Sequence, residues 1–164
     1  METTDKDTIA VLNDLIATCK DGVEGFKMAA GAVKSSAAKT LFTSRVSSIE
    51  QAAVDLQAAV RTAGGNPTDS GHAAASLHRG WINLKAAVSG KDEHEIIEEA
   101  VRGEDAAVTH YREALDKPLP DAVRRLVERQ LHGAQQNLAS VQALLTTAPA
   151  SARVRSDSRS DVRS

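Results

Sequence analysis

Apolar residues recur along this chain at alternating steps of three and four, the spacing that places them on one face of an α-helix. The pattern runs through four long stretches, at about residues 7–33, 42–63, 96–115 and 121–145. Each stretch has the narrow apolar seam of a helix in a bundle. β-branched residues never cluster into the alternating runs that a strand needs. The pattern therefore predicts an all-α fold.

The segments between these stretches predict how the helices connect. Residues 35–36 and 117–120 are short breaks, and a short link makes the helices that it joins antiparallel neighbours. The link over residues 65–91 is long and carries a helix of its own, at about residues 70–88. We therefore predict a ferritin-like four-helix bundle of two antiparallel hairpins, with an extra crossover helix between the second and third main helices.

The end of the chain lacks this pattern. Residues 149–164 show no periodicity and hold few apolar side chains, so they cannot bury enough surface to fold alone. We predict a bundle domain over residues 1–148, followed by a flexible polar tail over residues 149–164.

Composition narrows the classes of function. Charge is nearly balanced, with a net charge of −2 and a pI of about 6.2, which argues against a nucleic-acid binder. No apolar run approaches the roughly 20 residues that span a bilayer, and the N-terminus has no apolar signal core. Cys19 is the single cysteine, so no internal disulfide forms and a reducing compartment fits. These features predict a cytoplasmic protein that binds neither nucleic acid nor membrane.

One acid interrupts the apolar seam of the third long stretch. Glu104 stands between Val101 and Val108 and is followed seven residues later by Tyr111. A buried carboxylate is costly unless it is paired, so we expect a partner for it. The candidates are Tyr111 and a set of side chains on other helices, namely Gln130, His132 or an arginine.

Several short motifs occur together in this chain. They are Leu12–Ile16, Gly25-Phe26, Leu77–Lys85, Arg102–Ala107, Tyr111–Leu115 and Leu119-Pro120. In combination they resemble an uncharacterised bacterial four-helix-bundle family of the ferritin-like superfamily, a domain of unknown function, over about residues 7–146. The resemblance implies the fold and brings no established activity with it. Its context loosely suggests a role in stress response.

The resemblance also implies a question about metals, because ferritin-like di-metal proteins use carboxylates and E-x-x-H motifs that project into the bundle. Glu104 with Tyr111 resembles one element of that set, whereas no E-x-x-H occurs in the second or fourth long helix. Reflecting each hairpin about its turn brings further polar residues near the height of Glu104. The candidate ligands for iron, manganese or zinc are Glu24, Glu50, Glu104, Glu128 and His132.

Two interpretations of these polar residues near the height of Glu104 stay open. Glu104 either joins a metal site or is a buried carboxylate satisfied by hydrogen bonds, and we favour the second. The corresponding function is a non-catalytic bundle that acts by assembly, as a homo-oligomer or with a protein partner. The alternative is a metal-binding or redox bundle with an altered di-metal carboxylate site. No nucleophile or phosphate-loop motif predicts an enzyme.

Four glycines lie inside predicted helices at about the same height: Gly22, Gly25, Gly103 and Gly133. Each is disfavoured there by about 1 kcal/mol relative to alanine. We predict that the segment from His78 to Trp81 on the crossover helix docks across a strip that they line. The other interpretation is that they are four unrelated, tolerated glycines.

Overall fold

The computed structural model describes residues 5–68 and 80–163, with side chains as far as residue 146. Its helices are α1 (Asp5–Ala32), α2 (Ser36–Thr62), α4 (Leu84–Gly90), α5 (Glu93–Leu115) and α6 (Asp121–Arg163). No strand occurs in these ranges, so the prediction of an all-α bundle is confirmed.

Local chemistry fixes the helix ends. The Ser35 side chain accepts a hydrogen bond from the Ala38 N–H and caps α2, and Asp92 caps α5 through the Glu95 N–H. Such caps satisfy N–H groups that have no partner within the helix. After α2, Gly64 adopts φ +89°, a left-handed conformation that glycine accepts without a steric penalty.

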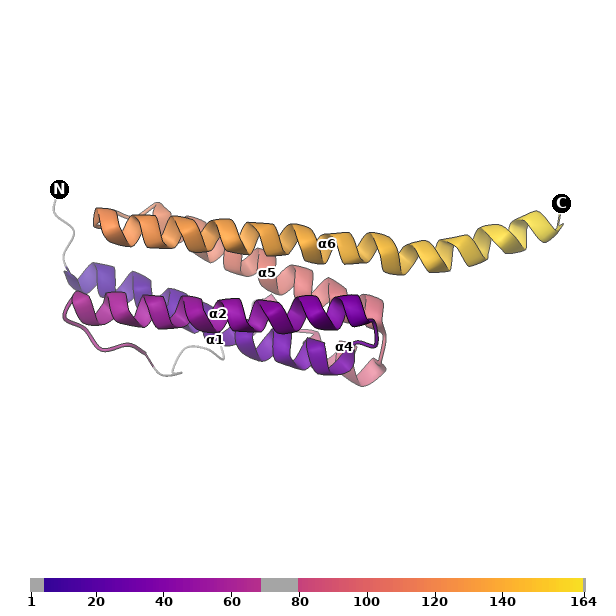
Figure 1. The fold of residues 1–164 in the computed structure, drawn as a ribbon, viewed down its shortest axis with the longest axis horizontal. Helices are drawn as coiled ribbons and strands as arrows, with labels where there is room; N and C mark the ends of the chain where they lie inside the picture. The colour runs from indigo at the N-terminus through magenta and orange to yellow at the C-terminus, as the bar shows by residue number, and fades with distance from the viewer. Residues whose placement is uncertain (1–4, 69–79, 164) are drawn as a thin grey trace.

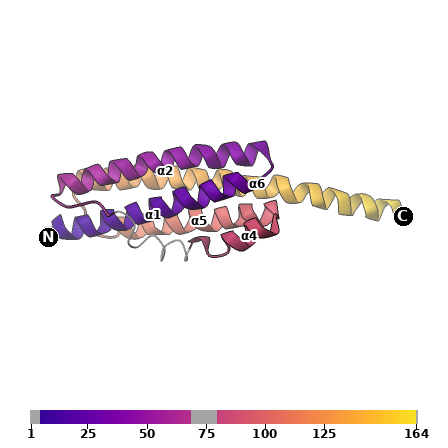
Figure 2. The ribbon, with the colours of Figure 1, turned by 90° about the horizontal axis from the view of Figure 1, so that it is seen from below.

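The long helices pair as two antiparallel hairpins, α1 with α2 and α5 with α6 (Figure 1). α1 also packs against α5, and α2 faces α6 (Figure 2). The Glu93 carboxylate accepts a hydrogen bond from the Ser35 N–H at 3.0 Å. The first turns of α2 and α5 therefore lie at the same end of the bundle, and these two helices run parallel.

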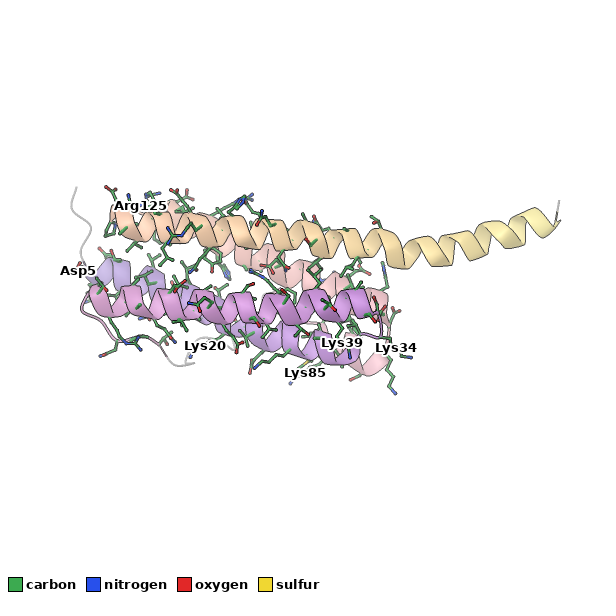
Figure 3. All side chains as sticks on the ribbon, viewed as in Figure 1. Asp5, Lys20, Lys34, Lys39, Lys85 and Arg125 are labelled. Atoms are coloured by element: carbon green, nitrogen blue, oxygen red, sulfur yellow. The ribbon has the colours of Figure 1, made fainter. Side chains whose placement is uncertain are left out.

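The predicted seams form the core. Phe26 lies at its centre, 5.5 Å from Phe42 and 4.9 Å from Trp81 between ring centroids. Charged side chains such as Lys39, Lys85 and Arg125 point away from the bundle (Figure 3). None of the helices in the described ranges combines the length and the apolar character that a bilayer crossing requires.

Two helix boundaries differ from the prediction. Most of the crossover helix expected over residues 70–88 lies outside the described residues, and the described helix of that link, α4, ends at Gly90. α6 does not end near residue 147 but continues to Arg163. Apolar periodicity stops there, yet alanine and arginine favour a helix without it. The division into a bundle and a flexible tail stays a prediction.

Trp81 docks between two of the four glycines. A Cβ added to Gly103 would lie 2.1 Å from the Trp81 ring, and one added to Gly25 would lie 2.5 Å from it. The docking prediction is confirmed for these two positions and is wrong for the others. Gly22 faces Ile49, and Gly133 has no neighbour within 4 Å of an added Cβ. His78 lies outside the described residues.

Replacing each glycine by alanine separates these two environments. We expect Gly103→Ala to lower the free energy of unfolding by about 2 kcal/mol, because the new methyl group displaces the buried indole. Gly133→Ala should raise it by up to about 1 kcal/mol through helix propensity alone. Urea unfolding followed by circular dichroism measures both. Equal effects of the two substitutions would contradict the docking.

Candidate functional site

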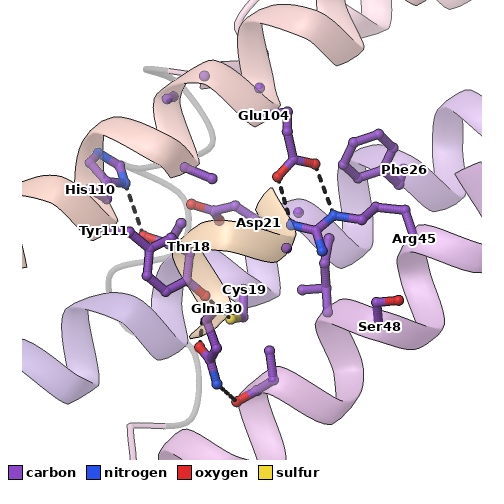
Figure 4. Close-up of a pocket in the computed structure, with 18 of the residues that line it drawn as sticks. Thr18, Cys19, Asp21, Phe26, Arg45, Ser48, Glu104, His110, Tyr111 and Gln130 are labelled. Atoms are coloured by element: carbon purple, nitrogen blue, oxygen red, sulfur yellow. Dashed lines mark hydrogen bonds and ion pairs between the residues drawn. The ribbon is translucent and has the colours of Figure 1, made fainter. Parts of the chain in front are cut away.

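The middle of the bundle holds a buried ion pair between α2 and α5. Arg45 donates two hydrogen bonds to Glu104, from Nε at 2.9 Å and from Nη2 at 2.6 Å (Figure 4). Asn137 of α6 donates a third, at 2.8 Å. The Glu104 side chain is 1% exposed and that of Arg45 is 11% exposed. The expectation that Glu104 has a partner is confirmed, and of the candidates left open the structure supplies an arginine; Asn137 was not among them.

The position of Arg45 beside the seam explains its reach. Arg45 precedes the buried Val46 by one residue and stands on the flank of the apolar face of α2. From that flank an arginine can lay its aliphatic stem along apolar neighbours and place the guanidinium inward. The fork of N–H groups then matches the carboxylate in a two-point contact. Sequence analysis lacked only the information that this flank faces α5.

A second polar chain links all four long helices just beside the ion pair. Tyr111 donates a hydrogen bond to Gln130 Oε1 at 2.9 Å, and Gln130 Nε2 donates to the Ala52 carbonyl at 3.1 Å. The Cys19 sulfur lies 3.5 Å from the Tyr111 hydroxyl. Because the tyrosine proton goes to Gln130, the thiol is the donor in the Cys19–Tyr111 contact. α2 and α6 are thus joined by an amide bridge.

Burial makes the Cys19 thiol and the Tyr111 hydroxyl weaker acids. Desolvation raises the pKa of the Cys19 thiol from 9.0 to about 11, although a Tyr111 hydroxyl turned toward the thiolate and the charge of Arg45 act in the opposite direction. Desolvation likewise raises the Tyr111 pKa well above 10.0. A nucleophilic cysteine needs exposure and a lowered pKa, so Cys19 serves as a buried core residue.

A third polar cluster lies where α1 meets α5. Thr18 donates to the Asp14 carbonyl at 3.1 Å and lies 2.9 Å from His110 Nδ1. The hydroxyl proton is therefore used, and His110 donates from Nδ1. Asp21, 3% exposed, lies beside this cluster. Sequence analysis missed these residues, although Thr18 and Asp21 are three apart and share a helix face.

A cavity of about 250 Å³ connects the three polar groups. Protein interiors rarely hold voids larger than a water molecule. This cavity is partly open to the surface, and its lining combines apolar area with polar groups, so it is suited to hold water or a ligand.

The structure does not bring the five predicted metal ligands together. Glu104 is buried, whereas the other four candidates are exposed: Glu24, Glu50, Glu128 and His132. Glu50 lies 4.0 Å from Lys27 on the surface. Within the described part of the chain, no three His, Cys, Asp or Glu side chains gather as a metal site would require. The four stand beside their seams on the outward side, and metal binding by them stays a prediction.

The ion pair can be tested by a double-mutant cycle. We expect Glu104→Ala to lower the free energy of unfolding by about 3–5 kcal/mol, because it leaves the Arg45 charge buried and unpaired. Replacing both residues by methionine should recover most of that loss. The exposed pair Lys27 and Glu50 is the matched control, and its loss should stay below about 1 kcal/mol. Arg45→Ala and the double alanine variant complete the cycle, and additive effects of the two alanine substitutions would contradict the coupling.

Alkaline pH should unfold the protein through Cys19. The folded chain keeps the thiol protonated up to about pH 11, whereas its ordinary pKa is 9.0. Stability is then complete below pH 9 and falls as the pH rises toward 11. We expect Cys19→Ala to flatten this fall in urea unfolding series. A disulfide reagent, which can react only with Cys19, should modify the native protein far more slowly than the urea-unfolded chain; equal rates would contradict the burial.

Comparison with known proteins identifies the family of the chain. No curated protein sequence matches it. Residues 7–117 match a family described as Domain of unknown function (DUF2383). The matched range, more than half of the chain, covers α1, α2, α4 and α5 and ends before α6, whereas the resemblance drawn from the sequence was expected to reach residue 146. The chain belongs to the DUF2383 family.

Proposed function

We propose that this protein is a ferritin-like bundle that works without a metal centre, and that it acts by assembly or by contact with another protein rather than by catalysis. The helix order supports the ferritin-like part of the proposal. α2 and α5 run parallel, so the end of α2 and the start of α5 lie at opposite ends of the bundle. One such long crossover distinguishes ferritin-like bundles from simple up-and-down bundles.

The observation that carries the proposal is the Arg45–Glu104 ion pair. Glu104 is the acid that would belong to a metal site, and both of its oxygens already accept hydrogen bonds from Arg45 or Asn137. An arginine side chain is always charged in proteins. Arg45 thus supplies, permanently and from within the chain, the positive charge that a metal ion would bring to this carboxylate.

The length of α6 supports a role in assembly. α6 has 43 residues and α5 has 23, and α6 continues well past the end of the other helices (Figure 1). A helix that projects from a bundle offers a surface that a second copy of the chain or another protein can contact. A cytoplasmic role in stress response rests on the family resemblance alone.

Metal analysis of protein purified without a histidine tag tests this proposal. After incubation with iron, manganese or zinc and removal of the excess, we expect far less than one ion per chain, because Arg45 and Asn137 already hold the oxygens of Glu104. Glu104→Ala should give the same low value, as should Glu128→Ala, which removes an exposed acid. Sedimentation equilibrium of the same samples should show a species heavier than the 17.3 kDa chain.

One result would overturn the proposal in favour of a metal-binding or redox bundle. It is a stoichiometric metal ion that is lost in Glu104→Ala and retained in Glu128→Ala. A monomer at every concentration would remove self-assembly and leave only a partner protein as the means of action.

A further inference from the structure

Gly133, in the first third of α6, has no structural explanation within the described chain. Gly25 and Gly103 make room for Trp81, whereas a Cβ added to Gly133 would meet nothing within 4 Å. Glycine in a helix interior is disfavoured relative to alanine, and it is useful where something must approach the backbone closely. Gly133 lines the cavity in the middle of the bundle. Gly133 therefore leaves open space at the edge of the cavity that it lines.

The cavity has a frame of fixed polar groups around this glycine. The Gln130–Ala52 hydrogen bond joins α6 to α2 on one side of Gly133, one turn toward the helix start. Asn137, one turn in the other direction, does not line the cavity but holds Glu104, which does and which binds Arg45. Lining groups near Gly133 are therefore held by hydrogen bonds between helices.

The lining of the cavity combines hydrogen-bond donors with apolar surface. Arg45 uses Nε and Nη2 on Glu104, which leaves the two N–H groups of Nη1 directed away from the carboxylate (Figure 4). Phe26, Ile49 and Trp81 supply apolar surface on the same lining. Ligand sites commonly combine such an apolar surface with a few convergent polar groups.

The lining carries charged side chains of both signs. Arg45 is paired with Glu104, and Arg129 and Asp55 carry opposite charges on the two helices at the opening. With Asp21 the lining holds three acidic and two basic side chains, which disfavours an anionic ligand. All three acids are already engaged, Glu104 with Arg45, Asp55 with Gln51 and Asp21 in an interaction of its own, so a cationic ligand would have to displace a partner.

We propose that the cavity beside Gly133 binds a small neutral molecule of about one ring, with a carbonyl oxygen that accepts from Arg45 Nη1. The volume of about 250 Å³ exceeds the roughly 150 Å³ that is enough for benzene in an engineered cavity. The apolar body of the ligand lies against Phe26 and Ile49, close to the α6 backbone at Gly133. This ligand site does not depend on whether the protein assembles with itself or with a partner.

Titration of the full chain with four one-ring probes, followed by ¹H–¹⁵N NMR, tests the proposal. The probes are acetophenone, benzoate, benzylammonium and toluene, and the reporters are the Arg45 Nε–H and the indole N–H of Trp81, the single tryptophan. We expect saturable shifts with acetophenone and at least tenfold weaker binding of the other three. Gly133→Leu should weaken acetophenone binding at least tenfold, because the new side chain fills the space. Gly133→Ala should weaken it less and keeps the test valid if the leucine variant fails to fold.

Ala139→Leu, at an exposed position of the same helix, is the matched control and should bind as the native chain does. The absence of saturable shifts with all four probes would overturn the ligand site and leave a water-filled cavity. Tighter binding of benzoate or benzylammonium would overturn the neutral class. Equal binding of toluene would overturn the role of Arg45. An equal loss in Ala139→Leu would overturn the location.

Discussion

Burying a carboxylate in a helical bundle is costly unless a cation or several hydrogen-bond donors meet it. Glu104 has both, with Arg45 from α2 and Asn137 from α6. The contact has consequences beyond the pair itself. Hydrophobic packing tolerates small slides of one helix along another, whereas a two-point hydrogen-bonded ion pair does not. The pair therefore sets the register of three of the four long helices, and the lining of the central cavity follows from it.

The two sides of the bundle are closed by different means. On the α1–α5 side, glycines at Gly25 and Gly103 let the Trp81 ring lie directly against the helix backbones. On the α2–α6 side, Gln130 reaches across to the Ala52 carbonyl, and the space behind it is not filled. The Trp81 contact is apolar and packed, whereas the Gln130 bridge is polar. The cavity lining reaches both sides, since it also includes Thr18 and His110 where α1 meets α5.

Apolar spacing predicted the four long helices, and capping residues such as Ser35 and Asp92 stand where helices begin. The partners across the interior were harder to predict. Reflection of the second hairpin about its turn placed Glu104 beside His132, but the structure pairs it with Asn137. Side chains lean toward the N-terminus of their own helix. In an antiparallel hairpin this lean moves the contact partner further from the turn on the second helix, an effect that counting residues ignores. Side-chain direction, not helix assignment, limited the site prediction.

The unfilled cavity indicates that stability alone did not shape this interior. A larger residue on α6 would gain helix propensity and bury apolar surface at once, so a sequence shaped by stability alone would fill the space. Instead Ala52 and Gly133 stand on its two sides, and neighbouring polar groups are used to bridge it rather than to close it. Local choices that lower stability without a packing reason are expected at functional sites. Glu104 is already paired with Arg45 and hydrogen-bonded to Asn137, so under the proposed function the space beside this ion pair is free for another occupant.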